Sequence, residues 1–286
     1  MTLRILALGC ILTAISCSPS PPIKIPETRP APKPAVTTPT PEVKLPPAPK
    51  PILPPPTPQS KLPISYQQRV IKGITLSMVS YDDRDHQLRI ADQPNGLGSR
   101  WSTAQEAAAT YGGVAAINGG FFTPEGKPLG QLIETGTKRG YINKSSLGAG
   151  FFTASNQRSA IVRRAAYLKN KAYWNPYNLL QTGPMLANNN SPISGLSKNN
   201  SRPRSFIAWD GKHYWAIGHA SACTLAELSQ ALAGKSPAGF PIKVAINLDG
   251  GRSSDLWASS QISNSAKTHR GFLNKPVRNY LVLTRK

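Results

Sequence analysis

The chain contains little cysteine, histidine or acid. Its 286 residues include 3 Cys, 4 His and 13 Asp or Glu, against 34 Lys or Arg. No His and Cys residues have the spacing of a zinc site, no Gly-x-Ser-x-Gly motif presents a nucleophilic serine, and no phosphate loop of the nucleotide-binding type occurs. These absences exclude the local signatures of three large enzyme classes. No run of five Lys or Arg residues occurs either, which argues against nucleic acid as the partner.

The first 17 residues have the features of an export signal. The apolar run from Ile5 to Ile15 is too short to cross a bilayer permanently, and small residues follow it. Residues 14–17 (Ala-Ile-Ser-Cys) resemble the cleavage site of a bacterial lipoprotein, in which the cysteine becomes the lipidated N-terminus. We therefore expect residues 1–17 to be a signal peptide and the exported protein to be lipid-anchored through Cys17 at the cell envelope. An ordinary signal peptide with an incidental cysteine is the alternative.

Residues 18–63 are dominated by proline. They hold 18 of the 28 prolines and no aromatic residue. Because proline fixes φ and lacks an amide donor, we expect an extended, solvated tether, which at roughly 3.1 Å per residue could span on the order of 140 Å. A proline-rich docking peptide is the alternative.

Residues 64–286 are long enough for one domain with a sizeable core. This part holds 27 basic against 11 acidic residues, a difference of +16. Such a charge favours anionic partners, and anionic lipid, acidic cell-wall polymer, phosphorylated substrate and nucleic acid all fit the charge alone. Cys10 would leave with the signal and Cys17 would be acylated, so Cys223 is expected to have no disulfide partner.

Strand patterns dominate the domain. Residues 68–81 alternate apolar and polar side chains and are expected to pair with residues 86–91 in a hairpin. The acidic connection at 82–85 is expected to be a solvated turn, because it lacks the later Gly and Glu of a calcium loop. A strand with exposed arginines is expected over 159–168, and Asp-Gly at 210–211 predicts a second hairpin.

Two capping boxes predict helices. Thr103-x-x-Glu106 predicts a helix over about 104–111, and Thr224-x-x-Glu227 predicts one that runs to about residue 233. Since strands outnumber these helices, the expected fold class is α+β, with mixed, mainly antiparallel sheets and a few helices in a single catalytic-type domain.

Two apolar strands each end in an asparagine that is followed, directly or after two residues, by two glycines. The two stretches are residues 114–120 (Val-Ala-Ala-Ile-Asn-Gly-Gly) and 244–251 (Val-Ala-Ile-Asn-Leu-Asp-Gly-Gly). We call these two strand ends, residues 118–120 and 247–251, the Asn-Gly turns. Glycine permits backbone angles that are closed to other residues and a close approach to a ligand. An arginine and two serines follow at 252–254, so a carboxylate, a cation and two hydroxyls can converge on one small volume.

Four motifs follow one another along the domain: residues 116–122, residues 182–186, residues 202–205 with the hairpin at 210–211, and residues 245–254. Together they resemble the phosphodiester glycosidase family, in that family's order and over roughly residues 71–284. The resemblance implies a hydrolase that cleaves a sugar from a sugar-1-phosphodiester. The chain departs from the family at Ser205, where threonine is common, and at Arg252, where a third glycine is common.

The residues at and after the two Asn-Gly turns supply the catalytic candidates. Cleavage would release a phosphate monoester, which needs far less protonation than an alkoxide, so one carboxylate with nearby cations can suffice. Asp249 is the first candidate for nucleophile or base, and a structural role in its glycine turn is the alternative. Glu134 is a weaker second carboxylate, with a solvated charge on a strand edge as its alternative role. Asn118 is the third catalytic candidate, because its carboxamide could face a sugar hydroxyl or a phosphate oxygen.

Ten residues are predicted to contact the substrate. Arg204 is the best candidate for a phosphate clamp because its planar guanidinium can bind two oxygens. His219 is either an acid or a satisfied core histidine, and Arg252 would either close part of the pocket or bind a phosphate. The full set is Gly119, Gly120, Thr182, Arg204, His219, Gly250, Gly251, Arg252, Ser253 and Ser254.

No metal ligand and no cofactor is predicted from these residues. A calcium ion is compatible with the chain, but no motif indicates one. The expected partners are an anionic sugar-phosphate or glycoconjugate substrate, and a membrane through the N-terminal lipid. The alternative function is a non-catalytic envelope lipoprotein that uses the same basic groove to bind an anionic sugar-phosphate polymer.

Overall fold

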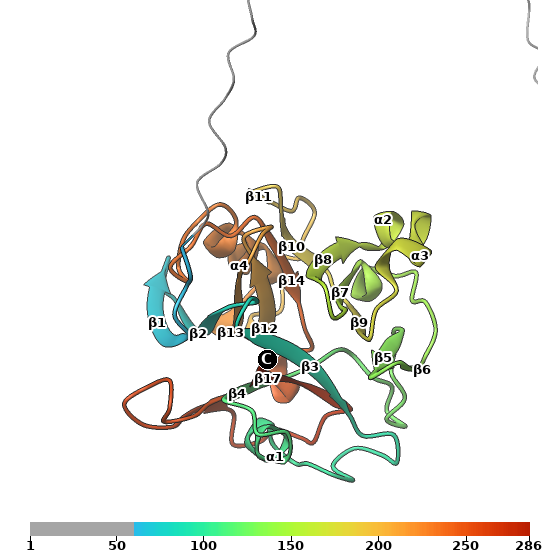
Figure 1. The fold of residues 1–286 in the computed structure, drawn as a ribbon. Coiled ribbons are helices and arrows are strands. Elements are labelled where there is room, and N and C mark those ends of the chain that lie inside the picture. The colour runs from blue at the N-terminus through green and yellow to red at the C-terminus, as the bar shows by residue number, and fades with distance from the viewer. Residues whose placement is uncertain (1–59) are drawn as a thin grey trace, which may run out of the picture. The chain divides into compact units, whose positions relative to one another are not determined.

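The computed structural model describes residues 60–286, so the predicted signal peptide, Cys17 and most of the predicted tether lie outside the described residues. Within residues 60–286 the strands form three sheets, and every strand pairing in them is antiparallel (Figure 1). These residues belong to one compact unit, 57–286. The fold is mainly β with some helices, which is broadly the α+β class that the sequence predicts.

The largest sheet has seven strands and carries one of the Asn-Gly turns. Two of its three hairpins illustrate how local turn chemistry shapes the sheet. Lys72 and Gly73 both have positive φ, 50° and 78°, as a two-residue hairpin turn needs, and the predicted hairpin at 210–211 is present. In order across the sheet, the strands are β1 (Ser65–Ile71), β2 (Ile74–Asp82), β13 (Tyr214–Cys223), β12 (Arg202–Trp209), β14 (Val244–Asn247), β10 (Met185–Asn188) and β11 (Ser191–Pro192).

Two five-stranded sheets complete the β structure of the described residues. The second sheet carries the other Asn-Gly turn, and the third lies to the right in Figure 1. The second sheet has the order β16 (Lys267–Arg270), β15 (Asp255–Ala258), β4 (Ala115–Asn118), β17 (Asn279–Arg285) and β3 (His86–Asp92). The third has the order β6 (Thr137–Arg139), β5 (Leu132–Glu134), β9 (Asn178–Thr182), β7 (Gly150–Ala154) and β8 (Ser159–Arg163).

Both predicted helices are present. Thr224 and Glu227 form the complete capping box of α4 (Leu225–Leu232). Thr103 caps α1 (Ala104–Thr110) in the same way, although the carboxylate of Glu106 accepts from the Ser102 amide rather than from Thr103. Two short helices, α2 (Arg164–Lys169) and α3 (Lys171–Trp174), and two 3-10 turns, η1 (Ser146–Gly148) and η2 (Gly251–Ser253), complete the described elements. No helix within residues 60–286 has the length and apolarity to span a membrane.

The strand expected over 159–168 is shorter than predicted. β8 ends at Arg163, and α2 begins at the next residue. Arg164 is not an exposed strand arginine, because its guanidinium donates to the carbonyls of Asn143, Ser145 and Gly148 at 2.8–3.0 Å. These bonds turn the chain out of the sheet and into the helix.

The hairpin predicted between residues 68–81 and 86–91 is wrong. The first range contains β1, a turn and β2, and β2 pairs with β1 and β13 in the seven-stranded sheet. β3 belongs to the second sheet, where it pairs with β17. β2 is buried on both faces, because its side chains enter two different core clusters. A central strand of this kind needs neighbours on both sides, which an isolated hairpin does not give.

The acidic turn after β2 is only partly solvated. Asp82 is fully buried, and Arg84 donates to both of its carboxylate oxygens at 2.8 and 2.5 Å. Although burial raises it, the hydrogen bonds from Arg84 and from the Leu62 amide hold the pKa of Asp82 at about 2. Asp83 accepts from His213 Nδ1 at 2.9 Å. Ligand atoms of Asp82, Asp83 and His213 lie within 4.8 Å of one another, but the guanidinium that already binds Asp82 makes this an ion-pair network rather than a metal site.

The core brings the ends of β4 and β14 together. One cluster contains side chains from all three sheets, among them Ile117 of β4 and Ile246 of β14. A second cluster lies between the seven-stranded sheet and α4, and a third lies under α1. Each strand is therefore fixed by packing one residue before its asparagine, and the two Asn-Gly turns begin from the same packed core.

Candidate active site

The two Asn-Gly turns are hydrogen-bonded to each other. Asn118 Nδ2 donates to the Asp249 carbonyl at 2.8 Å, and the Asp249 amide donates to the Gly119 carbonyl at 3.0 Å. The first turn ends β4 of the second sheet, and the second turn follows β14 of the seven-stranded sheet. The structure therefore joins two sheets at the point where the sequence predicts a site.

Asn118 holds this junction together. Its side chain is fully buried, and its Oδ1 accepts from Ser205 Oγ at 2.6 Å and from the Asp255 amide at 3.1 Å. Because Nδ2 donates to the Asp249 carbonyl, both the oxygen and the nitrogen of the carboxamide have partners inside the protein. Asn118 was predicted as catalytic, but the structure gives it the contacts of a positioning residue.

Gly119 and Gly120 use their amides inside the protein. Gly119 N donates to the Asn279 carbonyl at 2.8 Å, and Gly120 N donates to Asn279 Oδ1 at 2.9 Å. A Cβ atom on Gly119 would lie only 1.9 Å from Asn279 Oδ1. Gly119 is therefore required by the close approach of Asn279, whereas a Cβ on Gly120 would lie 3.0 Å from Leu180 Cδ1. The amides of both glycines bond to Asn279 and do not face a ligand as the sequence analysis had expected.

Asp249 is half-buried, and its carboxylate is held by its own turn. Oδ1 accepts from the Gly250 amide at 2.8 Å. Gly251 has a φ of 63°, and this left-handed residue turns the chain into η2, which brings the Ser253 hydroxyl to the carboxylate. Burial raises the pKa of Asp249, and the bonds from Ser253 and Gly250 and the charge of Arg202 oppose that rise. The carboxylate is therefore held in one orientation, and burial disfavours its charged form.

Arg204 lies beside this turn as a buried cation. Its Nε donates to the Cys223 carbonyl at 3.1 Å, and its Nη2 donates to the Asn200 carbonyl at 2.7 Å. A Cβ on Gly250 would lie 3.5 Å from Arg204 Cδ, so this side chain packs directly against the turn. No carboxylate of residues 60–286 lies within 4.0 Å of Arg204. A buried guanidinium without a counter-ion is a suitable partner for an external anion.

Arg202 is a second cation that the sequence reasoning missed. It is exposed, its charge acts on both Asp249 and Arg204, and its Cδ would lie 3.4 Å from a Cβ on Gly251. Burial, and then Arg202, lowers the pKa of Arg204. The only sequence signal for Arg202 was its place in the same Arg-Pro-Arg motif.

The hydroxyls predicted to bind substrate take different positions. Ser253 reaches the Asp249 carboxylate. Thr182 is fully buried and donates to the Asn247 carbonyl at 2.9 Å, so it fixes the base of the turn. Ser254 is also buried, and its Oγ has no partner among residues 60–286.

Arg252 points away from the carboxylate. It is exposed, and its Nε donates to the Leu273 carbonyl at 2.9 Å. The Lys275 amide donates back to the Arg252 carbonyl at 3.1 Å. Arg252 therefore connects η2 to the loop that follows β16, and the structure shows no contact between it and Asp249.

His219 belongs to a chain of three aromatic rings. It lies opposite Ser205 across β12 and β13, and its ring stacks on His269 with the ring centroids 5.6 Å apart. His269 Nε2 is 2.8 Å from the Tyr66 hydroxyl. Burial, and then His269, lowers the pKa of His219 to about 4, so the imidazole is neutral at physiological pH. His269 and Tyr66 lie far from any sequence motif and were not predicted.

Glu134 lies in a buried ion-pair network. Its Oε1 accepts from the Asp92 amide at 2.9 Å, and its Oε2 lies 3.3 Å from Arg139 Nη1. Asp92 in turn accepts two bonds from Arg278, at 2.7 and 2.9 Å. Glu134 thus links β5 of the third sheet to β3 of the second, and the structure shows no contact between it and either Asn-Gly turn.

We predict that Glu134→Gln lowers stability and leaves turnover intact. The amide keeps the contact with Asp92 but removes the charge that faces Arg139, so the free energy of unfolding should fall by about 1–3 kcal/mol. Denaturant unfolding and steady-state kinetics measure the two effects, with exposed Glu125→Gln as the control. A Glu134→Gln protein that is fully stable but inactive would return Glu134 to the catalytic set.

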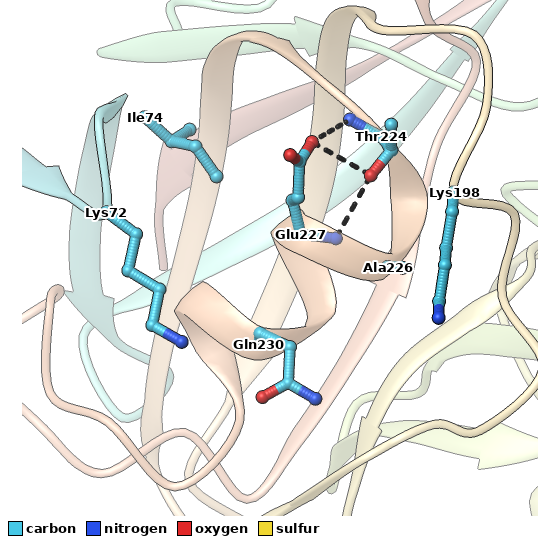
Figure 2. Close-up of a pocket in the computed structure, with 7 residues that line it drawn as sticks. All are labelled: Lys72, Ile74, Lys198, Thr224, Ala226, Glu227 and Gln230. Atoms are coloured by element: carbon cyan, nitrogen blue, oxygen red, sulfur yellow. Dashed lines mark hydrogen bonds between the residues drawn. The ribbon is translucent and has the colours of Figure 1, made fainter.

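The cavity in Figure 2 lies elsewhere. It has a volume of about 420 Å³ and lies at the N-terminal end of α4, where the side chains of Lys72 and Lys198 border it. The hydrogen bonds drawn there belong to the capping box of Thr224 and Glu227, which uses the backbone amides of both residues. We assign the candidate active site to the Asp249 turn because its carboxylate is oriented and because Arg204, a buried cation with no counter-ion among residues 60–286, packs against Gly250 of the same turn.

Comparisons with known proteins show the family and the fold of this domain. The family model for phosphodiester glycosidases matches residues 111–284. The catalytic domain of zebrafish N-acetylglucosamine-1-phosphodiester alpha-N-acetylglucosaminidase, solved in a form auto-inhibited by its pro-peptide, is similar in fold. The TM-score is 0.54 at 16% identity, and the match covers 78% of this chain and 83% of that one.

A hypothetical protein from Synechocystis gives a TM-score of 0.55 at 16% identity, over 78% of this chain and 62% of that one. At this identity the likeness to both structures shows the fold alone. No protein with a curated description matches the sequence. The family match spans both Asn-Gly turns and Arg204, and it covers more than half of the chain, so the chain belongs to the phosphodiester glycosidase family.

Proposed function

We propose that the protein is a hydrolase that releases a sugar from a sugar-1-phosphodiester. The bond that breaks joins C1 of the sugar to the bridging phosphate oxygen. Water supplies the new hydroxyl on C1, and the phosphate leaves as a monoester. The observation that carries this proposal is the oriented carboxylate of Asp249 in a turn against which Arg204 packs, since the buried guanidinium of Arg204 has no carboxylate partner among the described residues.

The two arginines suit the charge of the substrate. A phosphodiester carries one negative charge, and the phosphate gains a second as the C1–O bond breaks. Arg204 packs against Gly250 with its guanidinium held by two backbone carbonyls, and exposed Arg202 adds positive potential at the same turn. Because both groups are already in place, they would stabilise the charge that builds up on the departing phosphate without rearranging.

Asp249 supplies the negative charge that acts at C1. It either attacks C1 and forms a glycosyl-enzyme ester, or removes a proton from the attacking water. The first route retains the configuration of the released sugar and the second inverts it, so the anomer formed first distinguishes them. Neutral His219 is not needed as an acid, because the leaving phosphate requires little protonation.

A panel of sugar phosphodiesters tests the proposal. The protein should release free sugar from at least one member, and Asp249→Asn should not do so above background. If the unmodified protein binds anionic wall polymer and releases no sugar from any member, the non-catalytic binding function replaces the enzyme.

We also propose that the protein is lipid-anchored at the cell envelope. Cys17 and the Pro-rich residues 18–63 support this through sequence alone. Such a tether would let the domain reach anionic glycoconjugates at a distance from the membrane.

Metabolic labelling with palmitate tests the anchor. Label should be lost in Cys17→Ala, because no thiol remains at the cleavage site, and should be retained in the control Cys10→Ala. Equal labelling of both variants, or a mature chain that begins at another residue, contradicts the lipid anchor.

A further inference from the structure

A second cavity lies on the third sheet, apart from the Asp249 turn. It has a volume of about 620 Å³ and lies between the β5–β6 hairpin, the turn at 155–158 and the segment 173–177. This volume is within the range of pockets that bind small molecules. None of the residues that line it belongs to the candidate active site.

Two exposed tyrosine rings form flat walls of this cavity. Tyr173 is 60% exposed and Tyr177 is 49% exposed, although both are large and partly apolar. The Tyr177 backbone is fixed, because its amide donates to the Ala154 carbonyl at 2.9 Å and its carbonyl accepts from the Gly136 amide at 2.8 Å. The exposed ring is therefore presented by a rigid backbone.

Arg158 orients the other ring. Its guanidinium carbon lies 3.6 Å from the centroid of the Tyr173 ring, and Nη2 donates to the Tyr173 carbonyl. The cation covers one face of Tyr173 and leaves the rest of the side chain open. Exposed aromatic rings held in this way lose little conformational entropy when a ligand packs on them.

The polar lining of the cavity favours an anion that also carries hydroxyls. Arg158 and Lys138 line it, no acidic residue does, and neither cation has an ion-pair partner among residues 60–286. The side chains of Asn156 and Asn175 supply both donors and acceptors.

We infer that this cavity binds an anionic saccharide at a site separate from the catalytic turn. The C–H face of a pyranose ring would pack on Tyr177, since those hydrogens carry partial positive charge and the ring face is negative. Sugar hydroxyls would bond to the asparagine side chains, and a phosphate or carboxylate would contact Arg158 and Lys138. This binding does not rest on the proposed hydrolysis, because no residue of the Asp249 turn lines the cavity.

Titration with glucose 1-phosphate tests this site. The compound is a monoester, so cleavage of phosphodiesters does not consume it. Binding to the full chain should be saturable, and should persist in Arg204→Gln, where the anion site at the catalytic turn is lost. Glucose and inorganic phosphate, titrated separately, should each bind at least about tenfold more weakly than glucose 1-phosphate. Glucose lacks the anionic group for Arg158 and Lys138, and phosphate lacks the sugar ring that packs on Tyr177.

Four variants locate the binding. Tyr177→Ala should weaken the affinity for glucose 1-phosphate about tenfold, and Tyr177→Phe should preserve it, because the ring face is what binds. Arg158→Gln should weaken the affinity for glucose 1-phosphate more than the affinity for glucose. The control is Tyr141→Ala, since Tyr141 is 89% exposed and lies outside the cavity.

Two results would overturn the inference. One is the absence of saturable binding in the Arg204→Gln protein. The other is an affinity for glucose 1-phosphate that is the same in Tyr177→Ala as in Tyr141→Ala. Failure of the proposed hydrolysis would look different, because Asp249→Asn should keep this binding, and Tyr177→Ala should still cleave a small phosphodiester.

Discussion

Asp249→Asn is expected to lower kcat for a sugar phosphodiester by about 10³ or more, which corresponds to roughly 4 kcal/mol of barrier. Asparagine keeps the shape of the side chain and an oxygen that can accept from the Gly250 amide and the Ser253 hydroxyl. It cannot attack C1 or remove a proton from water. Steady-state kinetics measures the loss, and thermal unfolding shows whether the variant is folded.

The raised pKa of Asp249 sets the direction of two pH effects. Because burial raises the pKa of Asp249 in the folded state, the charged carboxylate destabilises the fold as pH rises through its titration range. Asp249→Asn should therefore be as stable as the unmodified protein or more so at neutral pH, and any gain should disappear in acid. Activity has the opposite sign, because the carboxylate must be charged, so kcat should fall as pH drops through the raised pKa.

Two outcomes would remove Asp249 from the centre of the site. If Asp249→Asn unfolds at neutral pH, the carboxylate is structural and serves the glycine turn. If it folds and keeps near-normal turnover, another group performs the chemistry.

Arg204→Gln is expected to reduce kcat/KM by about 10² or more, mainly through a higher KM. The side chain is buried, packs against Gly250 and has no carboxylate partner in the described part of the chain, so its charge should bind the phosphate of the substrate. A fall in kcat should follow only if the contact tightens as charge builds up on the departing phosphate. Arg204→Lys should recover little of the loss, because the ammonium lacks the planar arrangement of donors.

Arg252→Gln is the matched control for Arg204. Arg252 is also an arginine near the Asp249 turn, but it is exposed and bonded to the Leu273 carbonyl. Its loss should change kcat/KM by no more than about threefold. Equal effects of the two substitutions would mean that general positive charge, rather than the fixed guanidinium of Arg204, attracts the substrate.

Local signals predicted much of the fold. The capping boxes at Thr224 and Thr103 and the Asp-Gly hairpin at 210–211 depend on residues a few positions apart, so the sequence carries them directly. The partner of β3 was not predictable in this way. β3 pairs with β17, where His86 lies opposite Arg285 at the far end of the chain. Such a pairing depends on the packing of the whole core.

The same limit applies to the site. The sequence located Asp249 and Arg204 in motifs, because the glycines and the Arg-Pro-Arg run stand out. It did not show that the carboxamide of Asn118 is used internally, since the partner in the Asp249 turn is 131 residues away. Nor did it show that the Gly120 amide, which the sequence analysis expected to face a ligand, donates instead to the side chain of Asn279, 159 residues away.

Hydrolysis in water labelled with oxygen-18 tests the central claim most directly, because it shows which bond breaks. The sugar phosphodiester that the protein cleaves would be incubated in labelled water, and the masses of both products measured, with Asp249→Asn as the blank. Cleavage at C1 predicts label in the released sugar and none in the phosphate monoester. Label in the phosphate product would show attack at phosphorus and would contradict a glycosidase centred on Asp249.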